Sequence, residues 1–316
     1  MPLTSIKHYQ NSSSLLAYYV FLLYNYIVMK KLIVSKKYDG KKLNTFLLDS
    51  FDGLSLNTIY KALRKKDIRV NNIKVTENVN IYFNDEITVF INDDLLFKIF
   101  DLDIVYEDSN IVVVNKPVEL EVVSNNSEKT LTTILKEKYS FIEPCHRLDR
   151  NTTGLVIFAK NKEALDIILN KFKSLEIEKH YKCTVYGIPK KTSETLTAYL
   201  FKDTKKSMVY ICSSHKKGYQ NISTEYFVLS SNKSENTSIL EVILHTGRTH
   251  QIRAHLAYIG YPIIGDGKYG HNDINKKFKC KTQNLCSYKM KFKFIHPSQH
   301  LEYLNGKEFE KTNVQF

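Results

Sequence analysis

Short apolar runs with strand character recur from about residue 100 to the end of the chain, and they limit the folds open to it. Five runs are clear: Ile104–Tyr106, Ile111–Asn115, Leu155–Ala159, Tyr181–Tyr186 and Ile239–Leu244. Their β-branched and aromatic content is typical of strands, and a helical pattern between residues 164 and 172 alternates with them. We therefore expect an α+β domain over residues 101–316, and the composition gives no reason to divide it.

Residues 29–92 show a second pattern, which indicates a small α/β module ahead of this domain. An apolar stripe at helical spacing runs from Leu43 to Leu47, and Ser55 can cap a further helix. Two alternating runs then flank the pair of asparagines at 71–72, which tolerate the positive φ of a tight β-hairpin. Residues 93–100 are expected to form a linker between the module and the larger domain.

Residues 1–28 are an apolar extension that fits neither a membrane span nor a signal peptide. Leu15–Val28 is uncharged. As a helix it would span only about 21 Å, which is short of a bilayer core of about 30 Å. It also lacks a convincing small-residue cleavage site. We expect the extension to be dispensable and the protein to be cytoplasmic without membrane contact, with a membrane anchor as the alternative.

The charge of the chain favours a polyanionic partner. Lys and Arg number 46 against 33 Asp and Glu, a formal net charge of +13. Such an excess suits nucleic acid, although membrane attraction or solubility would give the same number. The arginines are few, at positions 64, 69, 147, 150, 248 and 253. Arginine in so lysine-rich a chain indicates positions that need a planar, two-pronged donor.

The segment HRLDRNTTGLVIFAKN, residues 146–161, places one carboxylate among these arginines. Asp149 lies between Arg147 and Arg150, just ahead of an apolar strand. A polar capping loop is the plainer interpretation. A nearby guanidinium, however, favours the ionised form of a carboxylate, which is the form that a nucleophile needs. Asp149 is therefore the candidate catalytic residue.

The segment HTGRTHQIRAH, residues 245–255, supplies further basic side chains. Thr249 can cap a helix there, and His250 and Arg253 share a face of that helix because they are three apart. Its three histidines recur every five residues, a spacing that does not bring zinc ligands together, so we expect no metal. GDGKYG at 265–270 lacks phosphate-cradle spacing and is interpreted as a structural loop.

Taken together, these segments resemble the RluA-type family of pseudouridine synthases. The motifs occur in the family's order: NKP at 115–117, HRLDRNTTGL at 146–155, HYKCTVYG at 180–187, HTGRTHQIRAHL at 245–256, GDGKYG at 265–270 and FIHP at 294–297. Residues 29–92, with a basic second helix, VNN and a closing DEITV strand, resemble the S4 RNA-binding domain. The resemblance implies a small S4 α/β module followed by a catalytic domain with a large mixed, mainly antiparallel sheet and flanking helices.

The resemblance also implies the roles of individual residues. Asp149 matches the catalytic aspartate, and Arg253 matches the arginine that pairs with it, for which we expect a two-pronged contact. Arg147 matches the arginine associated with the place of the flipped-out uridine, and Tyr181 the tyrosine that packs on the base. RNA contacts are expected from these further basic residues: Lys61, Arg64, Lys65, Arg69, Lys74, Arg150, Arg248 and His250.

The chain departs from the family pattern at three positions, none of which is a catalytic one. Glu119 stands where the family usually has the glycine of NKPxG, and Val123 and Cys286 each replace a frequent residue. These departures put loop shape or RNA contacts in doubt. The odd number of cysteines, five without a CxxC pair, excludes a fully paired disulfide framework.

The implied activity is the isomerisation of uridine to pseudouridine in RNA, by flipping the base, cleaving its glycosidic bond and rejoining it through C5. This reaction needs no cofactor, and the expected partner is large-subunit ribosomal RNA, which members with an S4 domain typically modify. We expect a monomer. The same chemistry on tRNA is one alternative. A non-catalytic RNA-binding protein is another, but it predicts loss of Asp149, Tyr181 or Arg253, and all three are present.

Overall fold

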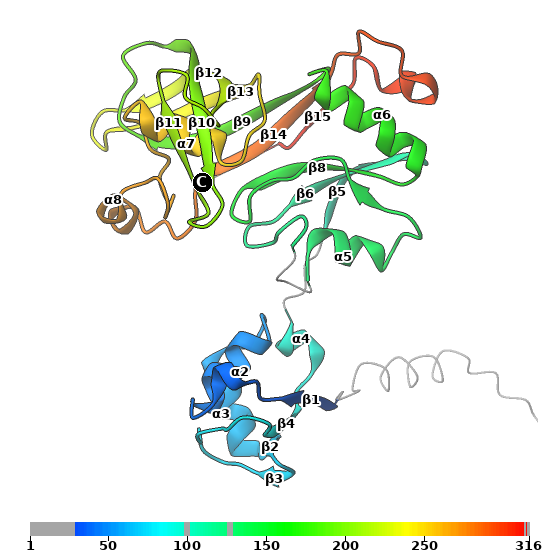
Figure 1. The fold of residues 1–316 in the computed structure, drawn as a ribbon, viewed down its shortest axis with the longest axis vertical. Helices are drawn as coiled ribbons and strands as arrows, with labels where there is room; N and C mark the ends of the chain where they lie inside the picture. The colour runs from blue at the N-terminus through cyan, green and yellow to red at the C-terminus, as the bar shows by residue number, and fades with distance from the viewer. Residues whose placement is uncertain (1–28, 98–101, 125–128, 313, 315–316) are drawn as a thin grey trace, which may run out of the picture. The chain divides into compact units, whose positions relative to one another are not determined.

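The computed structural model describes residues 29–97, 102–124, 129–312 and 314, and the chain divides into two compact units with a boundary at residues 101 and 102 (Figure 1). We call the part up to the boundary unit 1 and the rest unit 2. The expectations for residues 1–28 lie outside the described residues. Within the described ranges, no helix is long and apolar enough to cross a membrane.

Unit 1 is built on a four-stranded antiparallel sheet in the order β1-β4-β2-β3. Its elements are β1 (Met29–Ile33), a short 3-10 helix (Lys36–Tyr38), α2 (Leu43–Ser50), α3 (Leu56–Lys65), β2 (Ile68–Val70), β3 (Ile73–Lys74), β4 (Glu86–Phe90) and α4 (Asp93–Leu96). The expected cap is confirmed, because the side chain of Ser55 accepts the N–H of Thr58. The expected hairpin is confirmed too, with Asn71 and Asn72 at φ 50° and 65°.

The segment expected as a linker belongs in part to unit 1. Residues Asp93–Leu96 form α4, and Leu96 is fully buried in the apolar core of unit 1. The carbonyl of Leu96 also accepts the N–H of Gly53 at 2.9 Å. A single apolar side chain with a place in the core therefore extends unit 1 beyond the expected end at residue 92.

Unit 2 is built on an eleven-stranded sheet, whose main path runs β11-β10-β12-β13-β9-β14-β8-β6-β5. Its strands are β5 (Asp103–Glu107), β6 (Ile111–Lys116), β7 (Glu143–Pro144), β8 (Thr153–Ala159), β9 (Ile177–Tyr186), β10 (Ser193–Asp203), β11 (Met208–Cys212), β12 (Gln220–Asn232), β13 (Thr237–Leu244), β14 (Leu285–Phe292) and β15 (Glu308–Glu310). Only the pairing of β8 with β14 is parallel among the described strands. The expected large, mixed and mainly antiparallel sheet is confirmed.

Helices cover this sheet in two separate places. α6 (Lys162–Lys173) packs on β8, and its buried Ile168 joins a core with Ile157 and Phe292. α7 (Gln251–Tyr258) packs on β11 and β12 through Ala254. The remaining helices are α5 (Leu131–Lys136), α8 (Asn272–Lys277) and a 3-10 helix (Gln299–Leu304). Strands β9 and β14 connect the half of unit 2 that contains α6 with the half that contains α7 (Figure 1).

A glycine at the start of β8 allows these two halves to meet. Gly154 has φ +109°, and a Cβ atom on it would lie 2.1 Å from the carbonyl oxygen of Ser287 on β14. Ser287 pairs with Gly154 on one side and with Tyr181 of β9 on the other. The glycine of TTGL therefore lets β8 approach β14, and this register places the loop before β8 near Tyr181.

Candidate active site

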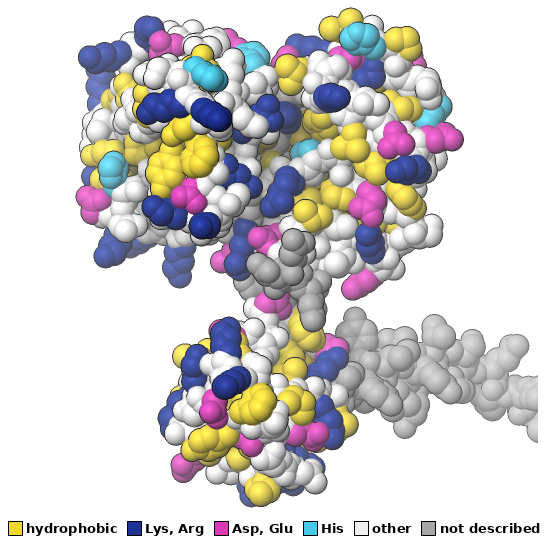
Figure 2. Space-filling view, in the orientation of Figure 1, with side chains coloured by type: hydrophobic (Ala, Val, Ile, Leu, Met, Phe, Trp, Pro, Cys, Tyr) yellow, Lys and Arg dark blue, Asp and Glu magenta, His cyan; other side chains and the backbone are white. Residues whose placement is uncertain are grey.

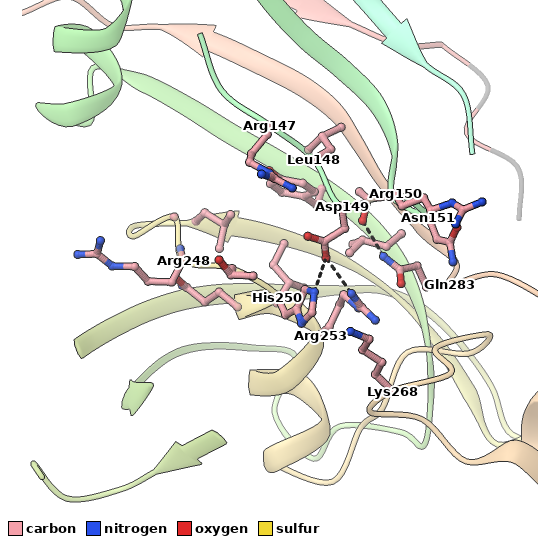
Figure 3. A pocket seen from close by; sticks show the side chains of 18 of the residues that line it. Arg147, Leu148, Asp149, Arg150, Asn151, Arg248, His250, Arg253, Lys268 and Gln283 are labelled. Carbon is pink, nitrogen blue, oxygen red and sulfur yellow. Dashed lines mark hydrogen bonds and ion pairs between the residues drawn. The ribbon is translucent and has the colours of Figure 1, made fainter. Parts of the chain in front are cut away.

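A cavity of about 740 Å³ in unit 2 brings together segments that are far apart in the sequence (Figure 3). Its lining comes chiefly from residues 146–152, 179–181, 244–253 and 265–285. These segments contain most of the motifs singled out in the sequence. The volume lies within the range of small-molecule sites, about 300–1,000 Å³.

Asp149 lies in the loop between β7 and β8, and its carboxylate points into the cavity (Figure 3). Its backbone carbonyl accepts the N–H of Thr152 at 3.0 Å, and the buried Leu148 anchors the loop. The side chain is 25% exposed, and its Oδ2 accepts one bond, from Nη1 of Arg253 at 2.8 Å. Among the described residues Oδ1 has no hydrogen-bonding partner, so one oxygen of the carboxylate is open to a substrate.

Arg253 lies between two carboxylates. The expected bidentate contact between its guanidinium and Asp149 is wrong. Its Nε and Nη2 donate to the two oxygens of Asp266 at 2.7 and 2.9 Å, and only Nη1 reaches Asp149. Burial lowers the pKa of Arg253, but hydrogen bonds and charge from Asp266 and Asp149 outweigh it and raise that pKa above its usual value. Arg253 therefore stays charged while buried, and Asp266 fixes the guanidinium that bonds Asp149.

Asp266 is a site residue by its contacts, and the sequence did not single it out. It is fully buried, and its Oδ1 also accepts the backbone N–H groups of Lys268 and Tyr269 at 2.8 and 3.1 Å. GDGKYG was interpreted as structural because its spacing does not suit a phosphate. The available signal was the acidic residue within that motif, which is the natural partner for a buried arginine elsewhere in the chain.

Tyr181 is buried in β9 and lines the cavity, as expected for a ring that contacts a base. Burial raises the pKa of its phenol well above the usual value, and the charge of Asp149 adds to this effect. The phenol is therefore neutral at physiological pH. A neutral, rigid aromatic ring near the carboxylate suits a flat heterocycle.

His250 precedes α7 with φ 53°, in the position expected for Thr249, so the expected cap was wrong. Its Nε2 lies 3.9 Å from Oδ2 of Asp149, and its Nδ1 lies 2.8 Å from the hydroxyl of Tyr269. Burial lowers the pKa of His250 to about 4, so the ring is neutral at pH 7. His250 and Arg253 both lie beside Asp149, although His250 precedes the helix and does not share a helical face with Arg253.

Lys116 ties the NKP segment to the loop that carries Asp149. Its buried amine donates to the carbonyls of Pro117 and Leu120, each at 2.7 Å, and of Arg150 at 3.0 Å. Burial lowers the pKa of this amine to about 7, which the charge of Asp149 partly opposes.

The backbone at Glu119, where the family has a glycine, has φ +65°, in the left-handed region that a glycine would adopt easily. The departure from NKPxG therefore leaves the loop conformation in place.

The rim of the cavity is basic. Arg147, Arg248, Lys179, Lys202 and Lys268 line it, whereas the lining holds two carboxylates, those of Asp149 and Glu121. Arg147 and Arg248 are exposed, and exposed Arg150 turns its Nε to the carbonyl of Glu119. Within the part of the chain that the structure describes, no group of three His, Cys, Asp or Glu side chains forms a metal site. Such a rim suits a polyanionic substrate.

The other expected RNA contacts belong to unit 1. Lys61, Arg64, Lys65 and Lys74 are exposed, and no ion pair joins them to a carboxylate of the described residues. Arg69 differs, because it is half-buried, stacks 4.9 Å from the ring centre of Phe90 and bonds Asn72. The structure therefore leaves four of these five side chains free for a partner.

Comparison with known proteins agrees with the motifs. Residues 110–258 match the RNA pseudouridylate synthase family. The chain is 32% identical to an uncharacterized RNA pseudouridine synthase of Mycoplasma capricolum, over 90% of this chain and 98% of that protein. It is 31% identical to the ribosomal large subunit pseudouridine synthase C of Buchnera aphidicola from Acyrthosiphon pisum, over 84% and 88%.

Solved structures show the same fold. The human RNA pseudouridylate synthase domain containing 1 matches with a TM-score of 0.53 at 22% identity, over 67% of this chain and 91% of that one. The human RNA pseudouridylate synthase domain containing 4 matches equally well, over 66% and 87%. The RluA-type resemblance is thus confirmed, and this chain belongs to the family of RNA pseudouridine synthases.

Proposed function

We propose that this enzyme isomerises uridines of large-subunit ribosomal RNA with Asp149 as its catalytic residue. The observation that carries the chemical part is the Asp149 carboxylate, held by one bond to Arg253 with its other oxygen open to the cavity. The substrate part is supported by the name of the Buchnera relative and by the S4-like pattern of unit 1.

The reaction breaks the N1–C1′ bond of uridine, turns the uracil and joins its C5 to C1′. N1 gains a proton and C5 loses one, so atoms and charge balance without an oxidant or a cofactor. Asp149 acts on the ribose, either by attacking C1′ or by removing a ribose proton, and both routes need an ionised carboxylate. The Arg253 guanidinium donates to Oδ2 of Asp149 at 2.8 Å and so fixes the direction of the carboxylate.

The target base must leave its stack before Asp149 can reach the sugar, which costs a few kcal/mol. The buried ring of Tyr181 offers a flat surface that compensates for lost stacking. Arg147 is exposed and lines the cavity, and its proposed role is to occupy the position that the flipped base vacates. The walls of the cavity then keep the detached uracil near C1′ until the new bond forms.

Pseudouridine-specific chemical mapping of ribosomal RNA tests the substrate. A strain without the gene is expected to lose one or more large-subunit pseudouridines, and a copy with Asp149→Asn should fail to restore them. Asn keeps the shape of the side chain but cannot ionise, so RNA binding should stay near normal. An unchanged large-subunit map with altered tRNA would assign the activity to tRNA instead.

The proposed role of unit 1 is to bind RNA through the free side chains of Lys61, Arg64, Lys65 and Lys74. Changing all four to Gln in the full chain should lower the magnitude of the log–log salt slope of RNA binding by roughly three, at about 0.7–0.9 per phosphate contact. The rate on a short substrate at saturating enzyme should stay the same. An unaltered slope would show that unit 1 binds something other than RNA.

A further inference from the structure

The outer face of the hairpin formed by β10 and β11 carries aromatic side chains that the catalytic site does not use. Side chains alternate across a strand, so Ala198 and Leu200 of β10 point inward and pack in a core with Ala254 of α7. Tyr199 and Phe201 consequently point outward. The face is open, since Phe201 is 38% exposed and Tyr210 on β11 is 41% exposed.

We call the rings of this hairpin the aromatic platform: Tyr199, Phe201, Tyr210 and Tyr219, with His215 at its edge. Phe201 lies directly opposite Tyr210 in the strand pairing. It also stacks on Tyr219, with ring centres 5.3 Å apart and planes at 29°. Tyr199 meets His215 edge-on at 5.4 Å. Side-by-side rings on adjacent strands offer flat surfaces of the kind on which unpaired bases stack.

Lysines accompany these rings in the sequence of the hairpin. The segment 199–219 holds Lys202, Lys205, Lys206, Lys216 and Lys217 and one acidic residue, Asp203. All five lysines are exposed, and none forms an ion pair with a carboxylate in the described parts of the chain. Figure 2 shows apolar side chains bordered by basic ones over this hairpin. Rings among unpaired lysines fit a chain of bases and phosphates.

The hairpin that carries the platform also contributes one residue to the catalytic cavity. Lys202 follows Phe201, so it projects from the opposite face of β10, and there it lines the cavity that contains Asp149. The hairpin is therefore part of the cavity wall, and RNA with a uridine at Asp149 lies beside it. A hairpin shared with the cavity favours RNA over an anionic membrane, which rings and lysines alone would also fit.

We propose that the aromatic platform binds unpaired nucleotides that flank the target uridine, stacking their bases on Phe201 and Tyr210 while the lysines contact their phosphates. The proposal rests on RNA being the substrate and deepens it, because it gives the enzyme a single-stranded recognition surface outside the cavity. A cross-strand aromatic pair also stabilises a hairpin by itself. The test therefore has to separate RNA binding from folding.

Phe201→Leu and Tyr210→Leu in the full chain keep an apolar side chain and remove the ring. Each should weaken binding of a fluorescein-labelled single-stranded RNA of about 12 nucleotides by about fivefold or more, and the double variant by up to about 100-fold. The measurement is fluorescence anisotropy. Tyr258→Leu is the matched control, because Tyr258 is 50% exposed on α7 outside the platform, and it should bind as the wild type does.

The salt dependence of RNA binding separates base stacking on the rings from phosphate contacts of the lysines. The ring variants should keep the wild-type log–log salt slope, whereas Lys216→Gln with Lys217→Gln should lower its magnitude by roughly 1.4, at about 0.7 per contact with a single strand. A 2-aminopurine in the RNA should be quenched by the wild type and not by the double ring variant. This quenching reports stacking directly, which a merely structural role of the rings would leave unchanged.

Three outcomes would overturn the proposal: unchanged RNA affinity in both ring variants, an equal loss in Tyr258→Leu, or ring-dependent binding of phosphatidylserine vesicles with RNA affinity intact. If the ring variants lose only thermal stability, the platform is a structural pair. The proposed chemistry is judged separately, because an active Asp149→Asn variant would refute the role of Asp149 and leave these binding results untouched.

Discussion

Arg253→Lys is the substitution that most directly tests how Asp149 is held. Arg253 makes two bonds to Asp266 and one to Asp149, and a lysine amine is a single point that cannot span both carboxylates. Asp266 is fully buried, whereas Asp149 is 25% exposed. An unpaired carboxylate costs more free energy at the buried Asp266 than at the partly exposed Asp149. The lysine amine should therefore pair with Asp266 and release Asp149.

The expected loss follows from that single bond. A hydrogen bond to a charged group contributes about 1.5–3 kcal/mol, and 1.4 kcal/mol corresponds to a tenfold change in rate, so turnover should fall by roughly 10- to 100-fold. The assay is single-turnover kinetics with saturating enzyme, which removes RNA affinity from the result. Arg248→Lys is the matched control, because exposed Arg248 lines the same cavity and its side chain makes no ion pair with the described residues.

A near-wild-type rate for Arg253→Lys would refute this account, because it would mean that charge alone is needed. A large loss of stability would confuse the result, so chemical denaturation of the variant belongs in the same experiment. A lower rate with an intact folding transition would locate the effect at Asp149.

Three further predictions concern cofactors, acid stability and a buried ion pair. Full activity should persist in EDTA on a short unstructured RNA, and a strict metal requirement there would contradict the proposed chemistry. His255 is buried, and burial lowers its pKa to about 4 from 6.5, so the unfolded chain takes up the proton first. Its contribution to stability is complete above pH 6.5 and is lost towards pH 4, by about 3 kcal/mol, and urea titrations of His255→Gln should lack this part of the pH dependence. Glu176→Gln should cost about 3–5 kcal/mol in the free energy of unfolding, because buried Lys171 loses its carboxylate partner at 2.7 Å. An unfolding midpoint equal to that of the wild type would contradict this value.

The sequence predicted much of the architecture because local rules decide it. The helical stripe from Leu43 to Leu47 became α2, Ser55 capped α3, and the asparagines at 71–72 formed the hairpin turn. Each depends on residues within one or two turns of chain. The same local rules wrongly predicted Thr249 as a helix cap. The backbone of His250 adopts a left-handed conformation that the neighbouring residues do not indicate.

The sequence predicted which residues belong to the candidate site, but it did not predict how they contact one another. The motifs identified Asp149, Tyr181 and Arg253, and the structure brings all three to one cavity. The contacts of Asp266 and Lys116 with this site were not predicted, since each joins a distant segment of the chain. Their residue types in the motifs gave the signal, but a motif does not state which partner a side chain finds.

The sequence by itself determined most elements, the basic character and the candidate carboxylate, because periodicity, composition and motif chemistry are local properties. Only the tertiary structure decided that the bidentate contact of Arg253 is with Asp266. It also decided that Gly154 packs against Ser287 and that Phe201 pairs with Tyr210 on the next strand. The physical reason is that strand register and the burial of charge depend on the whole sheet. A buried cation is shared among the carboxylates that the fold brings within reach, and sequence distance does not limit that choice.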